Sequence, residues 1–197
     1  MNVNKESYKN VMRIGCAILA GGKSSRMGTD KALLEYEGKS FVEKLCDELN
    51  SFEEKIVARG NRSDIEGVYW SIIPDIYTER GPIGGLHAVL STCNSEAMFC
   101  VSCDTPFLEL HLARKLCEHI RDGVDAVIAV TADGRKHPLC GVYRKTMLPV
   151  IEEQILAGNH RLMASLDKVR VEYVSLSPQD SLQLKNINTP EEYLAIK

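Results

Sequence analysis

The stretch IGCAILAGGKSSRMGTDK, residues 14–31, decides the fold because it joins an apolar run directly to a glycine-rich loop. The run at 14–20 is continuously apolar, which is typical of a parallel strand buried on both faces. A strand that ends in glycines exposes backbone N–H groups at the carboxyl edge of a sheet, where open α/β proteins bind ligands. The stretch therefore predicts an α/β protein with an anion-binding loop after its first strand.

The rest of the chain continues this alternation of strand and helix. Apolar runs typical of buried strands lie at 55–59, 68–73, 97–103 and 125–130, and amphipathic segments typical of helices lie at 40–49, 84–93 and 112–120. Such alternation predicts right-handed crossover connections. We expect a mostly parallel central sheet with helices on both faces.

The last third of the chain departs from this pattern. Residues 131–143 predict a hairpin, and residues 147–158 and 160–166 predict two helices on either side of a Gly-Asn break. In NTPEEYLAI, Thr189 is placed to cap a final helix, because a proline follows it and a glutamate lies three residues on. We expect a single domain over 13–197 after a loose polar leader at 1–12.

Composition limits the possible partners and compartment. The net charge of −3 gives no broad basic field, which argues against duplex nucleic acid and suits a small anionic ligand in a local basic pocket. An odd count of seven cysteines indicates reduced thiols. Cys100 and Cys103 form a C-x-x-C, but positions three apart on a strand face opposite ways, so a shared metal is not expected.

The apolar run after Arg13 resembles the middle of a signal peptide. It is short, however, and glycines, a lysine and an arginine follow it, which favours a buried strand. No other segment approaches the length of a membrane span. We expect a cytoplasmic protein with no membrane partner.

The sequence Gly22-Lys23-Ser24 looks like the end of an ATPase P-loop, but the register is wrong. A P-loop needs a glycine five positions before Gly22, and Ala17 in the strand occupies that place. A simple bend or a solvated basic loop is the alternative interpretation. Lys23, Arg26 and Lys31 nevertheless follow the glycines closely, so that amides and cations together can wrap a triphosphate.

A second candidate group lies at the end of another strand. In FCVSCDTPF, Asp104 follows an apolar run, and the proline two residues later prevents the strand from continuing. A hard oxygen ligand at a phosphate site suggests Mg²⁺, whereas the alternative role is an Asp that caps the next turn. The metal role requires this strand and the first strand to be neighbours.

At this point the motifs resemble a known family, the molybdenum cofactor guanylyltransferases. The pattern L-A-G-G-x-S-x-R-M-G-x-D-K at 19–31 carries the likeness. Further matching blocks follow in order through 14–197: GPIGGL (81–86), CDTPF (103–107), His137-Pro138 and NINTPEEY (186–193). The resemblance implies a Rossmann-like nucleotidyltransferase fold of the glycosyltransferase-A type. It also implies transfer of GMP from GTP to the terminal phosphate of molybdopterin, with release of pyrophosphate.

The resemblance also implies site residues, position by position. The implied nucleotide-binding residues are Leu19, Ala20, Gly21, Gly22, Lys31, Asn61, Asp75 and Asp104. Lys31 would contact the phosphates, and Asp104 would hold Mg²⁺. Late in the chain, Asn188 is a candidate second metal ligand, with a structural role in ending a strand as the equal alternative. His137, Arg161 and Asn186 are candidates to line the pterin side, although a His beside a Pro is more often a turn residue.

The expected chemistry agrees with these residue types. Attack of one phosphate on another brings anions together, so that charge neutralisation and in-line positioning carry most of the catalysis. Arg26, Lys31 and the amides of Gly21 and Gly22 would stabilise the departing pyrophosphate. A general base is not required, because the attacking phosphate is already ionised at neutral pH. GTP, molybdopterin and Mg²⁺ are thus the expected ligands, with transient contact to molybdoenzymes or other cofactor-handling proteins.

Other functions stay open on the sequence alone. One alternative is cytidylyl transfer to the same cofactor, or to a sugar or methylerythritol phosphate. Gly21 favours GTP, because cytidylyl relatives more often have an alanine there, whose side chain would intrude where a purine edge approaches. The other alternative is a non-catalytic nucleotide-binding domain, against which the joint presence of Arg26, Lys31 and Asp104 argues.

Overall fold

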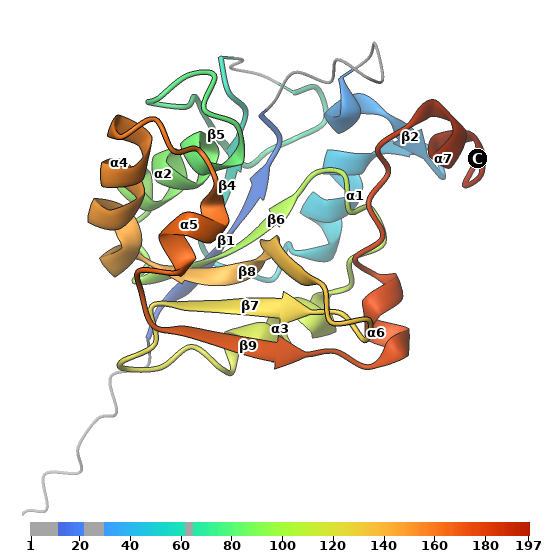
Figure 1. Cartoon of the computed structure of the whole chain (residues 1–197). Helices are drawn as coiled ribbons and strands as arrows, with labels where there is room; N and C mark the ends of the chain where they lie inside the picture. The colour runs from blue at the N-terminus through green and yellow to red at the C-terminus, as the bar shows by residue number, and fades with distance from the viewer. Residues whose placement is uncertain (1–11, 22–29, 62–64) are drawn as a thin grey trace, which may run out of the picture.

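A mixed sheet runs through the middle of the molecule (Figure 1). The structure is a computed structural model, and it describes residues 12–21, 30–61 and 65–197. In these residues the sheet has seven strands, in the spatial order β5, β4, β1, β6, β8, β7 and β9. Their bounds are β1 Ile14–Leu19, β4 Lys55–Ala58, β5 Ser71–Ile73, β6 Ala97–Ser102, β7 Ala126–Val130, β8 Lys136–Arg144 and β9 Val171–Ser175.

The strand directions confirm the expected mostly parallel sheet. β1 lies at the centre and pairs in parallel with β4 on one side and with β6 on the other. β8 pairs antiparallel with both β6 and β7, since it is the return strand of the hairpin expected at 131–143. The second strand of the hairpin, β8, therefore lies inside the sheet, between β6 and β7, and not at an edge.

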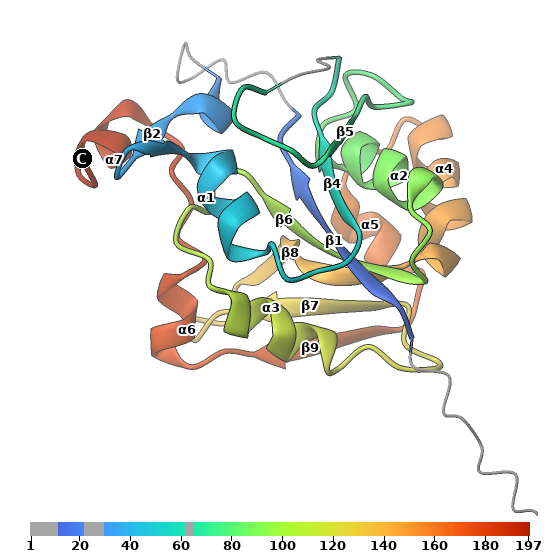
Figure 2. The ribbon, with the colours of Figure 1, turned by 180° about the vertical axis from the view of Figure 1, so that it is seen from behind.

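Helices cover both faces of the sheet, as expected (Figures 1 and 2). α1 (Phe41–Glu48) and α3 (Leu110–Cys117) pack on one face, against a core that includes Ile18, Phe99 and Val127. α2 (Pro82–Thr92), α4 (Leu148–Leu156) and α5 (Leu162–Leu166) pack on the other face, against a second core. Successive residues of β1 alternate between the two cores, which explains why that strand is apolar without interruption.

Short elements surround the carboxyl edge of the sheet, at the top right of Figure 1. They are the 3-10 helix η1 (Lys31–Leu33), the hairpin of β2 (Glu35–Tyr36) and β3 (Lys39–Ser40), and α7 (Pro190–Leu194). Leu34, Phe41 and Ile187 form a small buried cluster that packs these elements together. The start of α1 and the final segment of the chain are thereby held together beside the carboxyl edge of the sheet.

Most differences from the sequence expectations concern short elements. The expected strand at 68–73 begins only at Ser71. β2, β3, β9, the 3-10 helix η2 (Lys145–Met147) and α6 (Pro178–Leu182) were not predicted. The capping box at Thr189 is confirmed, and all seven cysteines are free thiols. Throughout the described ranges no helix has the length and apolar character needed to cross a bilayer.

Candidate active site

The carboxyl ends of β4, β1 and β6 meet at one edge of the sheet. Leu19 at the end of β1 is in register with Ser102 of β6, and the backbone N–H of Cys103 donates to the carbonyl of Leu19 at 3.1 Å. On the other side, the N–H of Ala20 donates to the carbonyl of Ala58 at 2.8 Å. β1 and β6 are thus neighbours, which is the condition that the metal role of Asp104 requires.

Three polar side chains from distant parts of the chain converge at this edge. The Lys31 ammonium lies 3.4 Å from Oδ2 of Asp104 and donates a hydrogen bond of 2.7 Å to Oδ1 of Asn188. Both acidic and basic side chains are largely buried, with exposed fractions of 13% for Asp104 and 19% for Lys31. The structure therefore brings together one predicted cation and the two predicted metal ligands.

Backbone contacts fix Asn188 beside Asp104. The N–H of Ile187 donates to the carbonyl of Asp104 at 2.9 Å, so residues 187–188 run alongside the end of β6. The N–H of Asn188 donates to Oε2 of Glu192 at 2.6 Å, and the same oxygen accepts from the N–H of Thr189. The capping box of α7 thus also positions Asn188, a role that its sequence pattern alone does not reveal.

The oxygen donors of this cluster fit a magnesium ion. Among the described residues, buried Oδ1 of Asp104 has no hydrogen-bond partner, which is costly for a carboxylate oxygen unless a cation meets it. One carboxylate and one amide oxygen are a suitable pair for Mg²⁺, which normally keeps waters and takes substrate phosphates as its other ligands. No group of three or more His, Cys, Asp or Glu side chains in the described ranges could hold a metal without such added ligands.

A second ion pair lies directly beside this cluster. Oδ2 of Asp30 lies 3.3 Å from Nη1 of Arg59, and the Arg59 side chain is only 5% exposed. Asp30 precedes Lys31 and caps η1, while Arg59 follows the last residue of β4. Sequence analysis did not predict this pair. The sequence does place a charged residue, Asp30, before the 3-10 helix and another, Arg59, after a strand. Nothing in the sequence, however, indicates that these two residues meet.

The predicted nucleotide residue Asp75 joins the same edge on the β4 side. Its Oδ1 accepts from the N–H of Gly60 at 3.3 Å, and its own N–H donates to the carbonyl of Gly60 at 2.8 Å. Burial raises the pKa of the Asp75 carboxyl, and the hydrogen bond from Gly60 opposes that shift. A Cβ atom on Gly84 would lie 3.4 Å from Oδ2 of Asp75, so the glycines of GPIGGL allow this carboxyl to approach the start of α2.

The structure gives Gly21 a neighbour that the sequence could not reveal. A Cβ atom at this position would lie 3.0 Å from the backbone nitrogen of Gly60, which is tighter than nearly all real contacts of that kind. Gly60 itself has a φ of 61°, in the left-handed region that favours glycine. The absence of a side chain at 21 is therefore explained by the approach of two backbone segments, independently of any base.

The remaining predicted residues are more scattered. Asn61 is exposed in the turn after Gly60. His137, at the start of β8, lies within hydrogen-bond distance of Thr131 and lines a small hollow of about 320 Å³ with Arg135 and Lys185. Burial lowers the pKa of His137, and Arg135 adds to that shift. Arg26 and Gly22, like Lys23, lie outside the described residues.

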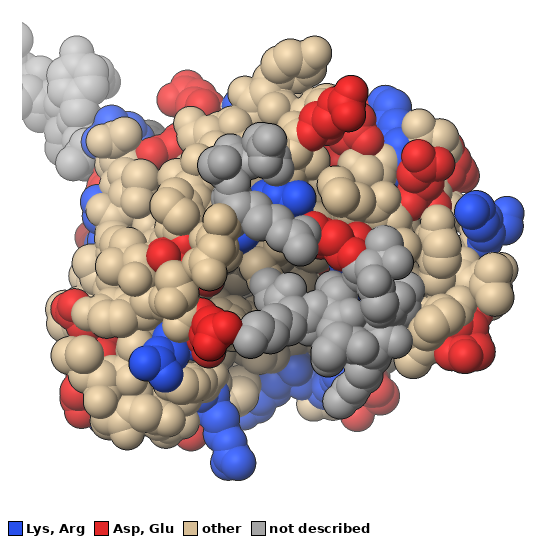
Figure 3. Space-filling model, turned by 90° about the horizontal axis from the view of Figure 1, so that it is seen from above, with Lys and Arg blue, Asp and Glu red and all other residues tan. Residues whose placement is uncertain are grey.

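Two further pterin-side candidates lie apart from each other. Arg161 is exposed at the N-cap position of α5 without a side-chain capping bond, and Leu162 of this helix belongs to the core on the α2 side of the sheet. Asn186 is half-buried. In the sequence it lies between Lys185, which lines the hollow of His137, and Asn188 of the Asp104 cluster. Seen from above, the face that carries this edge of the sheet has basic and acidic side chains next to each other in a central hollow (Figure 3).

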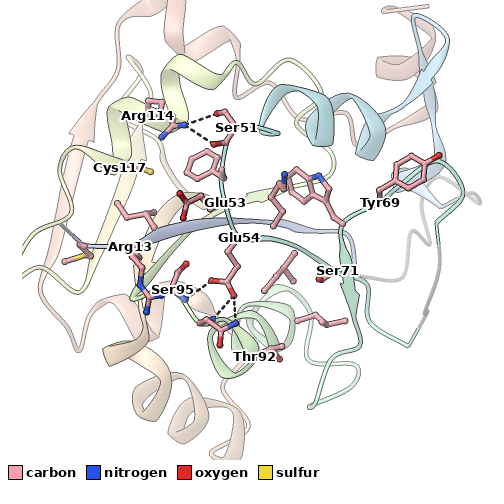
Figure 4. Close-up of a pocket in the computed structure, with 18 residues that line it drawn as sticks. Arg13, Ser51, Glu53, Glu54, Tyr69, Ser71, Thr92, Ser95, Arg114 and Cys117 are labelled. Carbon is pink, nitrogen blue, oxygen red and sulfur yellow. Dashed lines mark hydrogen bonds between the residues drawn. The ribbon is translucent and has the colours of Figure 1, made fainter. Parts of the chain in front are cut away.

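A second opening lies at the opposite, amino-terminal ends of the strands (Figure 4). It is a groove of about 1090 Å³, lined among others by Arg13, Glu54, Trp70 and Arg114. Glu54 accepts hydrogen bonds of 2.6 Å from the backbone N–H groups of both Asn94 and Ser95. Figure 4 draws these contacts, which join Glu54 to the residues after α2 and so stabilise the fold.

A parallel sheet with a glycine turn, a lysine and a buried carboxylate at its carboxyl edge suits a nucleotidyltransferase, which moves part of a nucleoside triphosphate to an acceptor. Comparison with known families agrees. The model of the MobA-like NTP transferase domain matches residues 16–171 of the chain. The protein is a nucleotidyltransferase and belongs to the MobA-like family.

Individual relatives match over most of their length. The chain is 31% identical over 176 residues to a protein of Flavobacterium johnsoniae named "Probable molybdenum cofactor guanylyltransferase", covering 89% of the chain and 92% of the relative. A protein of Carboxydothermus hydrogenoformans with the same name is 31% identical over 182 residues, covering 90% and 91%. The crystal structure of molybdopterin-guanine dinucleotide biosynthesis protein A from Archaeoglobus fulgidus shares the fold, with a TM-score of 0.79 at 23% identity and coverage of 94% and 96%.

Proposed function

We propose that this protein transfers GMP from GTP to the terminal phosphate of molybdopterin and releases pyrophosphate. The observation that carries the proposal is the convergence of Lys31, Asp104 and Asn188 at the carboxyl edge of the sheet. The names of relatives about 30% identical over nearly the whole chain support the choice of substrates. In the reaction, an oxygen of the acceptor phosphate forms a bond to the α-phosphorus, and the bond from that phosphorus to the β-phosphate oxygen breaks.

Lys31 is the residue we assign to the triphosphate. Its ammonium contacts a carboxylate oxygen of Asp104 and the amide oxygen of Asn188. When the triphosphate enters, its oxygens replace these partners, so that Lys31 neutralises charge on the β- and γ-phosphates as the pyrophosphate departs. Arg26 is proposed to assist from the loop before Lys31.

Asp104 and Asn188 are the residues we assign to a magnesium ion. Oδ1 of Asp104, which has no hydrogen-bond partner within the described ranges, is the proposed primary metal ligand, and the amide oxygen of Asn188 is the second. Bound there with the nucleotide, Mg²⁺ would supply charge neutralisation at the phosphate under attack. The backbone carbonyl of Asp104 also accepts a hydrogen bond from the N–H of Ile187. This bond keeps Asp104 and Asn188, the two proposed metal ligands, close together.

The chain supplies binding and orientation, because the acceptor brings its own nucleophile. A phosphate monoester with a second pKa near 6 is already an anion at neutral pH. Leu19, Ala20 and Gly21, together with Asn61 and Asp75, are proposed to bind the guanine nucleotide, and the amides of Gly21 and Gly22 are proposed to stabilise the departing pyrophosphate. The carboxyl of Asp75 accepts a hydrogen bond from the backbone N–H of Gly60 and is half-buried, and both features fix its orientation.

The acceptor is proposed to lie on the β7 and β8 side of Asp104. His137 and Asn186 are the residues proposed for that side; His137 and Lys185 line the small hollow, and Lys185 adds a positive charge there. Arg161 is the third proposed pterin residue. The free thiols are compatible with a cytoplasmic reaction, and the product would pass to molybdoenzymes or cofactor-handling proteins.

Pyrophosphate release with each of the four nucleoside triphosphates, Mg²⁺ and molybdopterin tests the proposal. We expect release with GTP only, and only when the pterin is present. Release that favours CTP would overturn the choice of base. Formation of GDP and free phosphate without any acceptor would overturn transfer itself.

A further inference from the structure

We propose that the ion pair of Asp30 and Arg59 is the device that positions Lys31, so that Arg59 is a positioning residue for nucleotidyl transfer. This inference depends on the proposed function for the role of Lys31 on the phosphates. It assigns a role to two residues other than the proposed metal ligands. Three observations carry it: the cap of η1, the burial of Arg59, and the anchoring of Arg59 in the sheet.

Asp30 sets the start of the helix that carries Lys31. Its Oδ1 accepts from the N–H of Ala32 at 3.2 Å, and its carbonyl accepts from the N–H of Leu33 at 3.1 Å. η1 is only three residues long, so this cap is a large share of what defines its direction. The other carboxylate oxygen, Oδ2, is the one that faces Arg59. One side chain therefore both caps η1 and ties it to the sheet.

Arg59 is the fixed partner in this pair. Its backbone N–H donates to the carbonyl of Ile73 on β5 at 3.0 Å, and it directly follows β4, which is paired with β1. The guanidinium is almost completely buried, and such a charge requires a partner of opposite sign. Because Arg59 cannot easily move away from the sheet, Asp30 is held at a fixed distance from the carboxyl ends of β4 and β1.

The consequence for Lys31 follows from chain geometry. A lysine side chain has four rotatable bonds, so its ammonium reaches a defined place only if its backbone is held. Asp30 holds that backbone from the β4 side, while Asp104 and Asn188 receive the ammonium from the β6 side. The next residue, Gly60, pairs with Asp75. The dipeptide at 59–60 thus connects the proposed phosphate and base contacts.

The substitution Asp30→Asn separates the two functions of Asp30. Asparagine caps helices as well as aspartate does, so the bond from Ala32 remains, whereas the charge that pairs with Arg59 is lost. We expect GTP affinity to fall about tenfold, with little change in the expected cap. A crystal structure of the variant should show Lys31 displaced from Asn188, a result that does not involve any nucleotide.

A double-mutant cycle tests whether Arg59 acts through Lys31. Arg59→Gln in the native background should weaken GTP binding and lower kcat/KM about tenfold. In the Lys31→Met background the same change should cost less than about twofold, because the residue to be positioned is gone. Equal losses in the two backgrounds would overturn the proposal, as would an Asp30→Asn structure in which Lys31 still contacts Asn188.

Matched controls keep the outcomes distinguishable. Arg114→Gln removes an exposed arginine, which contacts Ser51 and the ring of Phe52 away from this edge, and it should leave GTP affinity unchanged. If Arg59→Gln does not fold, Asp30→Asn and Arg59→Lys provide the same cycle with smaller perturbations. If Lys31→Met leaves GTP binding intact, the proposed phosphate role of Lys31 fails, whereas the crystallographic test of the ion pair still stands.

Discussion

Both ends of the central sheet carry charged side chains, but the contacts of these side chains differ. In the groove at the amino-terminal ends, Glu54 receives two backbone N–H groups and Arg114 contacts Ser51, so these charges are matched by the fold (Figure 4). At the carboxyl ends, Oδ1 of Asp104 is buried without a hydrogen-bond partner in the described part of the chain, and Lys31 contacts two oxygens that suit a metal ion. The contacts in the groove stabilise the protein, whereas the side chains at the carboxyl edge are placed to bind a ligand.

This difference shows that charge satisfaction, more than the volume of an opening, indicates the site. The groove of about 1090 Å³ is spacious, yet the backbone contacts of Glu54 explain its charge without any ligand. Oδ1 of Asp104, by contrast, meets no hydrogen-bond donor in residues 12–21, 30–61 and 65–197, although Lys31 pairs with Oδ2, so Oδ1 is left for an added cation. The predictions below therefore pair a change at one end of the sheet with its counterpart at the other.

Asp104→Asn should have the largest effect on activity. The substitution removes the negative charge proposed to hold the metal, and kcat should fall by about 10³-fold or more. The melting temperature should change little, because the neutral amide relieves the buried Oδ1 but loses the ion pair of Oδ2 with Lys31. Steady-state kinetics and thermal melting of the same preparation measure both. Transfer that continues at the native rate would remove Asp104 from the reaction.

Lys31→Met should change two affinities in opposite directions. GTP binding should weaken about tenfold or more, because a cation on the phosphates is lost. Binding of Mn²⁺ without nucleotide should become about tenfold tighter, since the ammonium that occupies Asp104 and Asn188 is gone. Calorimetry measures the first and electron paramagnetic resonance of free Mn²⁺ measures the second. An unchanged Mn²⁺ affinity would contradict the placement of the metal on these two residues.

Glu54→Gln is the counterpart in the groove and should affect stability alone. One acceptor oxygen for the N–H groups of Asn94 and Ser95 is lost, which should lower the free energy of unfolding by about 1 kcal/mol at neutral pH. GTP transfer should stay at the native rate. A large loss of activity in this variant would break the distinction between the two ends of the sheet.

The stability effect of Glu54 should also depend on pH. Burial acts to raise its pKa, but hydrogen bonds from Ser95 and Asn94 together outweigh burial and lower it. A lowered pKa in the folded state means that the stabilisation is complete above the unfolded pKa of about 4.3 and is lost as the pH falls through the folded value. Chemical denaturation of native protein and variant should therefore give converging stabilities toward low pH.

Gly21→Ala should have the smallest effect and no base selectivity. The added methyl group presses on the backbone nitrogen of Gly60, so we expect a loss of about 1 kcal/mol in stability. Because Gly60 pairs with Asp75, GTP and CTP affinities should both change by a similar factor of about three. A selective loss of GTP with a gain of CTP would instead support a direct contact between this position and the purine.

Long apolar runs and strand ends could be predicted from the sequence. β1 and β6 are continuous apolar runs buried on both faces, and the residues that follow them, Asp104 above all, were predicted at the correct edge. Short segments could not, because β5 and the β2–β3 hairpin have two or three residues each and too little periodicity. β9 was missed since it is only half-buried and mixes polar residues with apolar ones.

Pairings between distant residues were the second limit. Thr189 and Glu192 predicted a capping box because capping is local, whereas its effect on Asn188 beside Asp104 depends on how the final segment crosses the sheet. The same applies to Asp30 and Arg59, which meet only because β4 pairs with β1. Local patterns thus predicted candidate residues, and the sheet order determines which of them act together.

The central claim is that Asp104 and Asn188 hold the metal that acts on a nucleotide bound beside Lys31. A crystal grown with GTP and Mn²⁺ tests it most directly, because anomalous scattering locates manganese without assumptions about the ligand. We expect a manganese peak in contact with Asp104 and Asn188, with the Lys31 ammonium moved from Asn188 to the phosphates. A nucleotide and manganese bound elsewhere, with Lys31 still on Asp104 and Asn188, would contradict this account.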